Sequence, residues 1–318
     1  MPNDDVSTNG DVAVIAADDA AAGAGVDPGA DAAGHLGSEL SGLDQLELAG
    51  DGPRQGLGRR IWSLTWPKVA AVALGIGIWQ VAVWLEWKPE YALASPGDAF
   101  SELWKLVSEG TLWTALDITM RRAVGGFIVA LVLGVAVGTL VAGIKPVRVA
   151  VGSLITGLQT MPSIAWFPLA ILLFGKSEGA IRFVVLLGAA PSIANGLITG
   201  IDQIPPILRR AGRVLGARGP SEYWYVVLPA ALPSFIGGLK QGWAFAWRSL
   251  MAGELLVIIR GQASLGYLLT VNRDLNDSAG LIAVMIAILI VGIAVDTVFF
   301  GTLDRAVRRR WGLIETAT

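Results

Sequence analysis

The residue types that most often perform chemistry are scarce in this sequence. It has no cysteine, and its only histidine is His35. Thiolates and imidazoles supply most nucleophiles, general bases and zinc ligands, so a hydrolytic triad and a thiolate- or histidine-rich metal site are not expected. The stretch 170-AILLFGKSEG-179 contains Gly-Lys-Ser, but a phosphate-binding loop requires a glycine where this chain has Ala170. We therefore expect no metal, no nucleotide and no catalytic activity on this chain.

One charged residue lies inside an apolar run and is a candidate for a functional role. Arg248 lies within the apolar run 230–259, and a charge at membrane depth is costly and usually functional. The alternative is a structural cation, neutralised by Glu254 or by the backbone carbonyls of a broken helix. Both interpretations stay open at the level of sequence.

A basic segment, 202–228, separates two apolar runs and is far longer than a turn requires. Its first half, 202-DQIPPILRRAGRVLG-216, opens with start signals at Asp202 and a Pro-Pro step, and then repeats apolar residues at helical spacing opposite arginines. Gly216 stands where this stripe ends and suits a left-handed C-terminal cap. A short amphipathic helix is therefore predicted over 202–216.

The second half of this segment, 220-PSEYWYVVLP-229, is predicted to form another short helix that stops before Pro229. The two helices would form a compact knob. Three interpretations of the knob compete: an amphipathic hairpin on an anionic membrane surface, a peg gripped by another protein, or a nucleic-acid contact. Four arginines on a membrane protein give the last one little support.

Composition places these features in a membrane. The chain of 318 residues is 53% hydrophobic and only 16% charged, whereas charged residues make up about a quarter of a soluble domain. Several runs approach the roughly 20 apolar residues needed to cross the hydrocarbon core. Six candidate spans are 67–87, 121–144, 149–174, 180–201, 230–259 and 279–303. The expected fold class is an all-α integral membrane protein with six transmembrane helices.

The third candidate span, 149–174, contains Pro162 and Pro168. Prolines free backbone carbonyls, and inside a membrane this is tolerated where protein neighbours or a water-filled cavity satisfy them. The run either lines a path or is a kinked packing helix. Glycines and alanines recur in the other runs, which favours close approach of helices.

The distribution of basic residues predicts the orientation. Lys and Arg are more numerous in the segments on the same side of the membrane as the N-terminus than in the segments on the opposite side. Both termini are therefore predicted to be cytoplasmic. The tryptophans that bracket the first span as interfacial anchors are Trp62, Trp66, Trp84 and Trp87. Between the first two spans, 95–113 is predicted to form an external amphipathic helix capped by Ser95 or Asp98, lying on the bilayer or on the bundle.

The N-terminal segment 1–56 differs from the rest of the chain. It is rich in Ala, Gly and Asp and almost free of aromatic and β-branched residues, so it is predicted to be a disordered acidic tail. One patch, 40-LSGLDQLEL-48, could form a short amphipathic helix, either transient or docked on a partner or on the membrane. The membrane domain is expected to occupy 57–318.

The basic segment resembles the signature loop of bacterial ABC-importer permeases, the binding-protein-dependent transport inner-membrane components. In that signature Glu-Ala-Ala is followed by three residues, Gly, nine residues, an aliphatic residue, any residue and Leu-Pro. Here Gly216 is followed by nine residues and then by 226-VVLP-229, while 210-RAG-212 occupies the Glu-Ala-Ala positions. The stretches 119–142, 159–175, 228–256 and 264–269 are similar to the branch that carries nitrate, alkanesulfonates and taurine.

The resemblance implies the type I ABC-importer permease fold with a cytoplasmic coupling helix, in a bacterial inner membrane. Two permease copies would form the pore, two separate ATPase subunits would bind ATP and Mg²⁺ and receive the knobs, and an extracytoplasmic substrate-binding protein would deliver the cargo. Membrane lipid would surround the chain, and no nucleic acid would bind. The implied coupling residues are Arg210, Ala211, Gly212, Leu215, Gly216, Ala217, Arg218, Tyr223, Leu228 and Pro229.

The cargo implied by the branch is a small organic anion, either an aliphatic sulfonate or a taurine- or nitrate-like anion. A path for such an anion needs a mild positive potential and hydrogen-bond donors. The candidate path residues are Gln159, Pro162, Trp166, Gln241, Trp247 and Arg248. A six-span secondary transporter or channel is the alternative, but it would be expected to place carboxylates in the membrane for ion coupling and would leave the knob unexplained. An integral-membrane enzyme is a third option.

Overall fold

The computed structural model describes residues 57–311, and over this range all regular structure is helical. The predictions for the segment 1–56, including His35 and the patch 40–48, lie outside the described residues. The chain divides into two compact units, 1–71 and 72–318, which are described separately. In the first unit the described part is the beginning of helix α2 (Leu57–Trp84).

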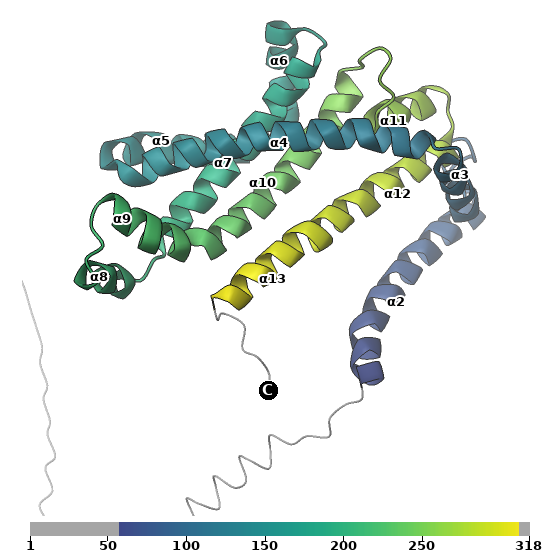
Figure 1. Ribbon diagram of the computed structural model, residues 1–318. Helices are drawn as coiled ribbons and strands as arrows, with labels where there is room; N and C mark the ends of the chain where they lie inside the picture. The colour runs from purple at the N-terminus through teal and green to yellow at the C-terminus, as the bar shows by residue number, and fades with distance from the viewer. Residues whose placement is uncertain (1–56, 312–318) are drawn as a thin grey trace, which may run out of the picture. The chain divides into compact units, whose positions relative to one another are not determined.

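The second unit holds the rest of α2 and a series of helices joined by short connections (Figure 1). In chain order they are α3 (Pro96–Ser108), α4 (Thr111–Gly143), α5 (Lys145–Thr160), the 3₁₀ segment η1 (Ser163–Trp166), α6 (Phe167–Phe174), α7 (Glu178–Asp202), α8 (Pro206–Val214), α9 (Pro220–Glu222), the π segment η2 (Tyr223–Val227), α10 (Leu228–Leu256), α11 (Leu265–Asp274), α12 (Ser278–Ala294), the π segment η3 (Val295–Phe300) and α13 (Gly301–Arg310).

Among the described residues, four stretches of helix are long and apolar enough to cross a membrane. They are Thr65–Trp84, Thr111–Gly143, Glu178–Asp202 and Ser278–Arg310, and the bent pair formed by α5 and η1–α6 would make a fifth. The helix α10 has 29 residues, which is sufficient length, but its mean hydropathy is lowered by polar residues such as Lys240 and Gln241. An all-α membrane fold is confirmed, with four or five spans by composition where six were predicted.

Two predicted spans have different limits in the structure. The helix α4 begins at Thr111 rather than near residue 121, so Arg121 and Arg122 lie about three turns inside it rather than at its start. The predicted span 149–174 is bent by 103° between α5 and the η1–α6 pair. The predicted break at Pro162 is present, because a proline disfavours the helical conformation of the residue before it, and Met161, before Pro162, has an extended backbone (φ −74°, ψ 126°).

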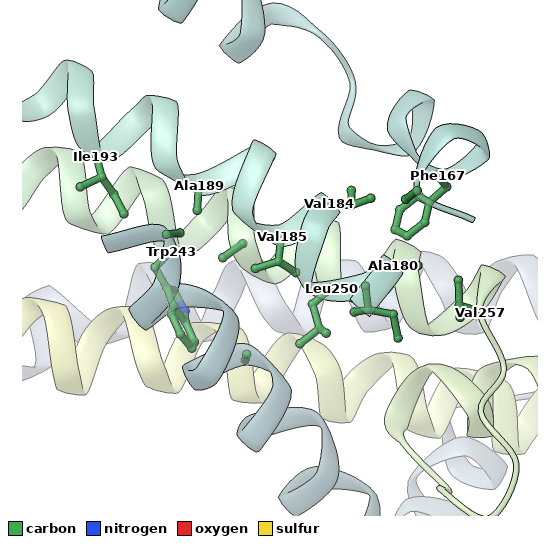
Figure 2. Packing of buried hydrophobic residues seen from close by; sticks show 14 of the residues in the cluster. Phe167, Ala180, Val184, Val185, Ala189, Ile193, Trp243, Leu250 and Val257 are labelled. Atoms are coloured by element: carbon green, nitrogen blue, oxygen red, sulfur yellow. The ribbon is translucent and has the colours of Figure 1, made fainter. Parts of the chain in front are cut away.

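The core of the second unit forms where α7 packs against α4 and α10. Figure 2 shows side chains of this core, among them Val184, Val185 and Ile193 from α7 and Trp243 and Leu250 from α10. Small residues let the backbones approach closely, which is the usual means of helix association where lipid removes the hydrophobic driving force. The closest approach is between Gly196 on α7 and Gly238 on α10: a Cβ added at Gly196 would lie 2.5 Å from the Cα of Gly238.

The connection between α2 and α4 contains the predicted amphipathic helix. The helix α3 starts after Ser95, whose side chain accepts a hydrogen bond from the backbone N–H of Asp98, so the prediction of Ser95 as the cap is confirmed. The helix packs on α12, and its inward side joins an apolar cluster with Leu112 and Leu265.

The segment between α7 and α10 forms the predicted knob, with two corrections. Asp202 is the last residue of α7 and does not start α8, whose N-cap is Pro205. The second helix does not stop before Pro229 but continues through η2 into α10. A proline ring clashes with the carbonyl four residues earlier in a regular α-helix, and the wider π turn directly before Pro229 accommodates it. Gly216 has φ +89°, which confirms the predicted left-handed conformation.

Substitution of Gly196 by alanine is expected to separate α7 from α10. The added methyl group would meet the backbone of Gly238, which cannot rotate away, so Gly196→Ala should lower the free energy of unfolding by about 1–3 kcal/mol. Gly237→Ala is the matched control, because a Cβ at Gly237 meets no atom within 4 Å. Unfolding of the purified protein in detergent measures both. Equal stability of the two variants would contradict this packing.

Candidate functional site

Arg248 lies on α10 without a carboxylate partner among the described residues. Its Nε donates a hydrogen bond to the carbonyl of Ala244 at 3.2 Å, and its guanidinium carbon lies 5.1 Å from the centre of the Phe245 ring. Glu254 pairs with another residue, so neutralisation of Arg248 by Glu254 is wrong, whereas the contact with a backbone carbonyl is present. The guanidinium therefore keeps most of its donors available.

Arg248 lines two hollows in the second unit. The smaller has a volume of about 270 Å³ and lies at the break between α5 and η1, where its lining includes Gln159, Thr160, Pro162 and Ser163. The larger has a volume of about 570 Å³ and lies between α10 and α12. Its lining is mainly apolar and is formed by Trp243, Ala244, Trp247, Arg248, Met251, Leu269, Met285, Ile288, Leu289, Gly292, Ile293 and Asp296.

The structure brings together four of the six predicted path residues. Gln159, Pro162 and Arg248 line the smaller hollow, and Trp247 lines the larger one beside Arg248. The other two lie elsewhere. Trp166 packs against the apolar core. Gln241 is exposed and lines neither hollow, because at 3.6 residues per turn it points about 120° away from Trp247, six residues later on α10.

A tryptophan pair extends the apolar wall of the larger hollow. Trp243 was not predicted as a path residue, yet its ring stacks on that of Trp247 with centroids 6.4 Å apart. The signal was in the sequence, since residues four apart on a helix share a face. Trp243 also contacts Phe127 edge to face and is almost completely buried, so the wall is fixed by the core behind it (Figure 2).

Gln159 lines the smaller hollow, but its amide nitrogen does not open into it. The Nε2 atom is buried and has no hydrogen-bond partner within the described residues. Buried polar groups are nearly always paired, so Gln159 marks a place beside the break between α5 and η1 where polar groups are incompletely matched.

The strongest polar cluster in the described chain was missed by the sequence analysis. Arg122 on α4 is buried, and it donates hydrogen bonds to Glu178 at 2.7 Å and to Glu254 at 2.9 Å. Glu254 also accepts from Thr119 Oγ1 at 3.0 Å and from the backbone N–H of Gly266 at 3.0 Å. The predicted span began at residue 121, which placed Arg122 at the end of the span rather than inside the helix, so this partnership was not foreseen.

Further members complete the cluster. Thr119 Oγ1 accepts a hydrogen bond from the backbone N–H of Leu265 at 3.0 Å, and Arg122 also donates to the side-chain oxygen of Gln262. The cluster thus joins α4, α7, α10 and the start of α11. None of these groups lines either of the hollows beside Arg248. The cluster around Arg122 therefore has a structural role.

A second ion pair lies at the far end of the larger hollow. Lys240 Nζ is 3.0 Å from Asp296, which belongs to η3 and lines the hollow. Both side chains are about half exposed. The pair neutralises the only acid that lines this hollow.

The knob exposes its apolar side. Val214 and Leu215 are each 87% exposed. Gly212 is buried against Val226, and a Cβ added at Gly212 would lie 2.7 Å from a methyl group of Val226. Arg213 pairs with Glu222 at 3.2 Å and braces α8 against α9.

The other predicted coupling residues lie on or beside this surface. Arg210, Ala211, Gly216 and Arg218 are exposed, Ala217, Tyr223, Leu228 and Pro229 are half-buried, and the glutamate of the family signature is absent at Arg210. An exposed apolar ridge on a short basic helix suits a protein partner.

The sequence profile of the family described as binding-protein-dependent transport system inner membrane component matches residues 130–309. This range includes the knob, both hollows and more than half of the chain. The chain belongs to this family. It is the permease subunit of an ABC importer, a transport component, and this assignment replaces the alternative of a secondary transporter or channel.

Relatives of the permease agree with this assignment. An ABC transporter permease protein of Methanocaldococcus jannaschii is 32% identical over 191 residues, which cover 60% of this chain and 71% of the relative. The taurine transport system permease protein TauC of Escherichia coli is 27% identical, covering 62% of this chain and 76% of TauC. The fold resembles that of the inward-facing MetNI methionine ABC transporter, with a TM-score of 0.53 and 20% identity over 63% of this chain and 98% of that one.

The buried cluster predicts different effects at two neighbouring arginines. Arg122→Met would leave Glu178 and Glu254 without their counter-ion, so it should lower the free energy of unfolding by about 3–5 kcal/mol. Arg121→Met breaks only an exposed pair with Asp117 and should cost at most about 1 kcal/mol. Unfolding in detergent compares the two. Adding Glu254→Gln to Arg122→Met should recover part of the loss, and equal stability of the two single variants would refute the cluster's role.

Proposed function

We propose that the permease forms the translocation path for a small organic anion, either an aliphatic sulfonate or a taurine- or nitrate-like anion, and is driven through the 202–228 segment by a separate ATPase subunit. The observation that carries the proposal is the position of Arg248, which lines two hollows and has no acidic partner among residues 57–311. A fixed cation with free donors attracts an anion. The relative TauC, a taurine transport permease, supports this cargo class.

The knob would bind the ATPase. The residues proposed for this contact are Arg210, Ala211, Gly212, Leu215, Gly216, Ala217, Arg218, Tyr223, Leu228 and Pro229. Val214 and Leu215 supply an exposed apolar ridge, and the basic residues around it supply charge. ATP and Mg²⁺ would be held by the partner ATPase and not by this chain. Closure of two ATPase subunits would then displace the knobs and switch the pore from inward- to outward-facing.

The remaining parts of the assembly follow from the family. Two identical permease copies would enclose the pore, an extracytoplasmic binding protein would deliver the cargo, and lipid would cover the outer surface. Both termini would be cytoplasmic, because the knob and the arginines at the end of α13 would then lie on the same side. We also propose that 1–56 is an acidic tail outside the membrane domain 57–318.

Placing a charge on the knob's apolar ridge tests the coupling. Leu215→Asp should reduce co-purification of the ATPase subunit roughly tenfold or more, because an aspartate would be buried in an apolar contact. Leu275→Asp, at an exposed leucine beyond α11, is the matched control and should leave the yield unchanged. Wild-type ATPase yield with Leu215→Asp would overturn the docking assignment.

Removing the cation tests the path. Arg248→Gln should lower ATP-dependent uptake of ethanesulfonate by about tenfold, since a charge-assisted hydrogen bond to the cargo is lost. The complex should still assemble with its ATPase, because Arg248 lies outside the knob. Arg273→Gln, at an exposed arginine that pairs with Asp274, serves as the charge control. Unchanged uptake by Arg248→Gln would exclude it from the path.

A further inference from the structure

The two hollows that Arg248 lines differ in chemistry. We propose that the cargo is an amphipathic organic anion whose acidic head is held by Arg248 in the smaller hollow and whose apolar body, several carbons or an aromatic ring in size, packs against Trp247 in the larger one. This inference rests on the proposed function and narrows its substrate class. It favours bulky anions over compact ones such as nitrate or taurine.

The smaller hollow suits an acidic head. Arg248 and Ser163 are among the polar residues that line this space of about 270 Å³, and none of its described lining residues is acidic. Sulfonate and carboxylate groups form strong, charge-assisted hydrogen bonds with a guanidinium, which Arg248 supplies. The bend of 103° between α5 and η1–α6 creates this space.

The larger hollow suits an apolar body. Its volume of about 570 Å³ lies within the range of pockets for organic ligands, roughly 300–1,000 Å³. Trp243 and Trp247 are stacked along one side, and Met251 and Met285 lie among the other lining residues. Methionine and tryptophan walls bind flat or flexible apolar groups. A compact anion bound at Arg248 would leave this wall without a partner.

The charges around the larger hollow also disfavour a zwitterionic cargo, because its ammonium group would need an acidic partner. The only acidic residue that lines this hollow is Asp296, which is already paired with Lys240. An ammonium group on the cargo would therefore find no unpaired acid among the described lining residues. The cargo therefore needs one charged end and one apolar end.

Direct binding to the permease separates this inference from the specificity of the binding protein. The full-length permease, purified with its ATPase in lipid nanodiscs, is titrated calorimetrically with 1-naphthalenesulfonate and with ethanesulfonate. The naphthalene compound should bind about tenfold or more tightly, since apolar contact area is its only advantage. Trp247→Ala and Met285→Ala should each reduce this difference, and Met285 is exposed, so its truncation should leave the fold intact.

Two control variants exclude non-specific binding of the aromatic probe. Trp104→Ala removes an exposed tryptophan from α3, outside both hollows, and should leave both affinities unchanged. Arg248→Gln should weaken binding of both probes.

The outcomes distinguish the two proposals. Selective loss of naphthalenesulfonate affinity in Trp247→Ala and Met285→Ala supports the inference. Equal affinity for the two sulfonates, or binding of neither, overturns it, while the Arg248-dependent uptake test of the proposed function stands by itself. Unchanged binding and unchanged uptake in Arg248→Gln would overturn both.

Discussion

A charge inside an apolar helix bundle must find its partner within the protein, and this constraint organises the described part of the permease. Arg122 enters the bundle on α4 and is matched by Glu178 from α7 and Glu254 from α10. Replacing water around an ion pair demands additional hydrogen bonds, and Thr119, Gln262 and the backbone of α11 supply them. Four helical segments are thereby held in one register at one end of the bundle.

The contrast between two arginines follows from the same constraint. Arg122 is surrounded by acceptors and cannot be spared for a ligand. Arg248 has a backbone carbonyl and an aromatic ring but no carboxylate within the described residues, and it lines both hollows. One arginine therefore holds helices together, while the other keeps donors available at the surface of the hollows.

Much of this architecture could be predicted from sequence, because hydropathy, proline and glycine carry local information. The run 180–201 corresponds to α7, the cap at Ser95 is present, and Gly216 has its left-handed conformation. What failed depends on distant partners. Inside α4, Arg122 is neutralised by Glu178 and Glu254, which are distant in sequence. The helix continues through Pro229 by means of a π turn, and the sequence contains no pattern that predicts the position of that turn.

Only some of the six predicted path residues line the hollows, for a similar reason. Gln159, Pro162, Trp247 and Arg248 line the hollows, while Trp166 and Gln241 point to other surroundings. Residue type identified the candidates, but the face on which each lies is fixed by tertiary packing.

The continuity of α9, η2 and α10 has a mechanical consequence. From Pro220 to Leu256 the chain is helical without interruption, which makes a rod about 55 Å long at the usual rise per residue. The knob is attached to one end of this rod, and Arg248 and Trp247 lie toward the other. Because no loop interrupts this segment, a movement of the knob is passed along continuous helix toward Arg248 and Trp247, and the π segment and the prolines at its start are the places where it can bend.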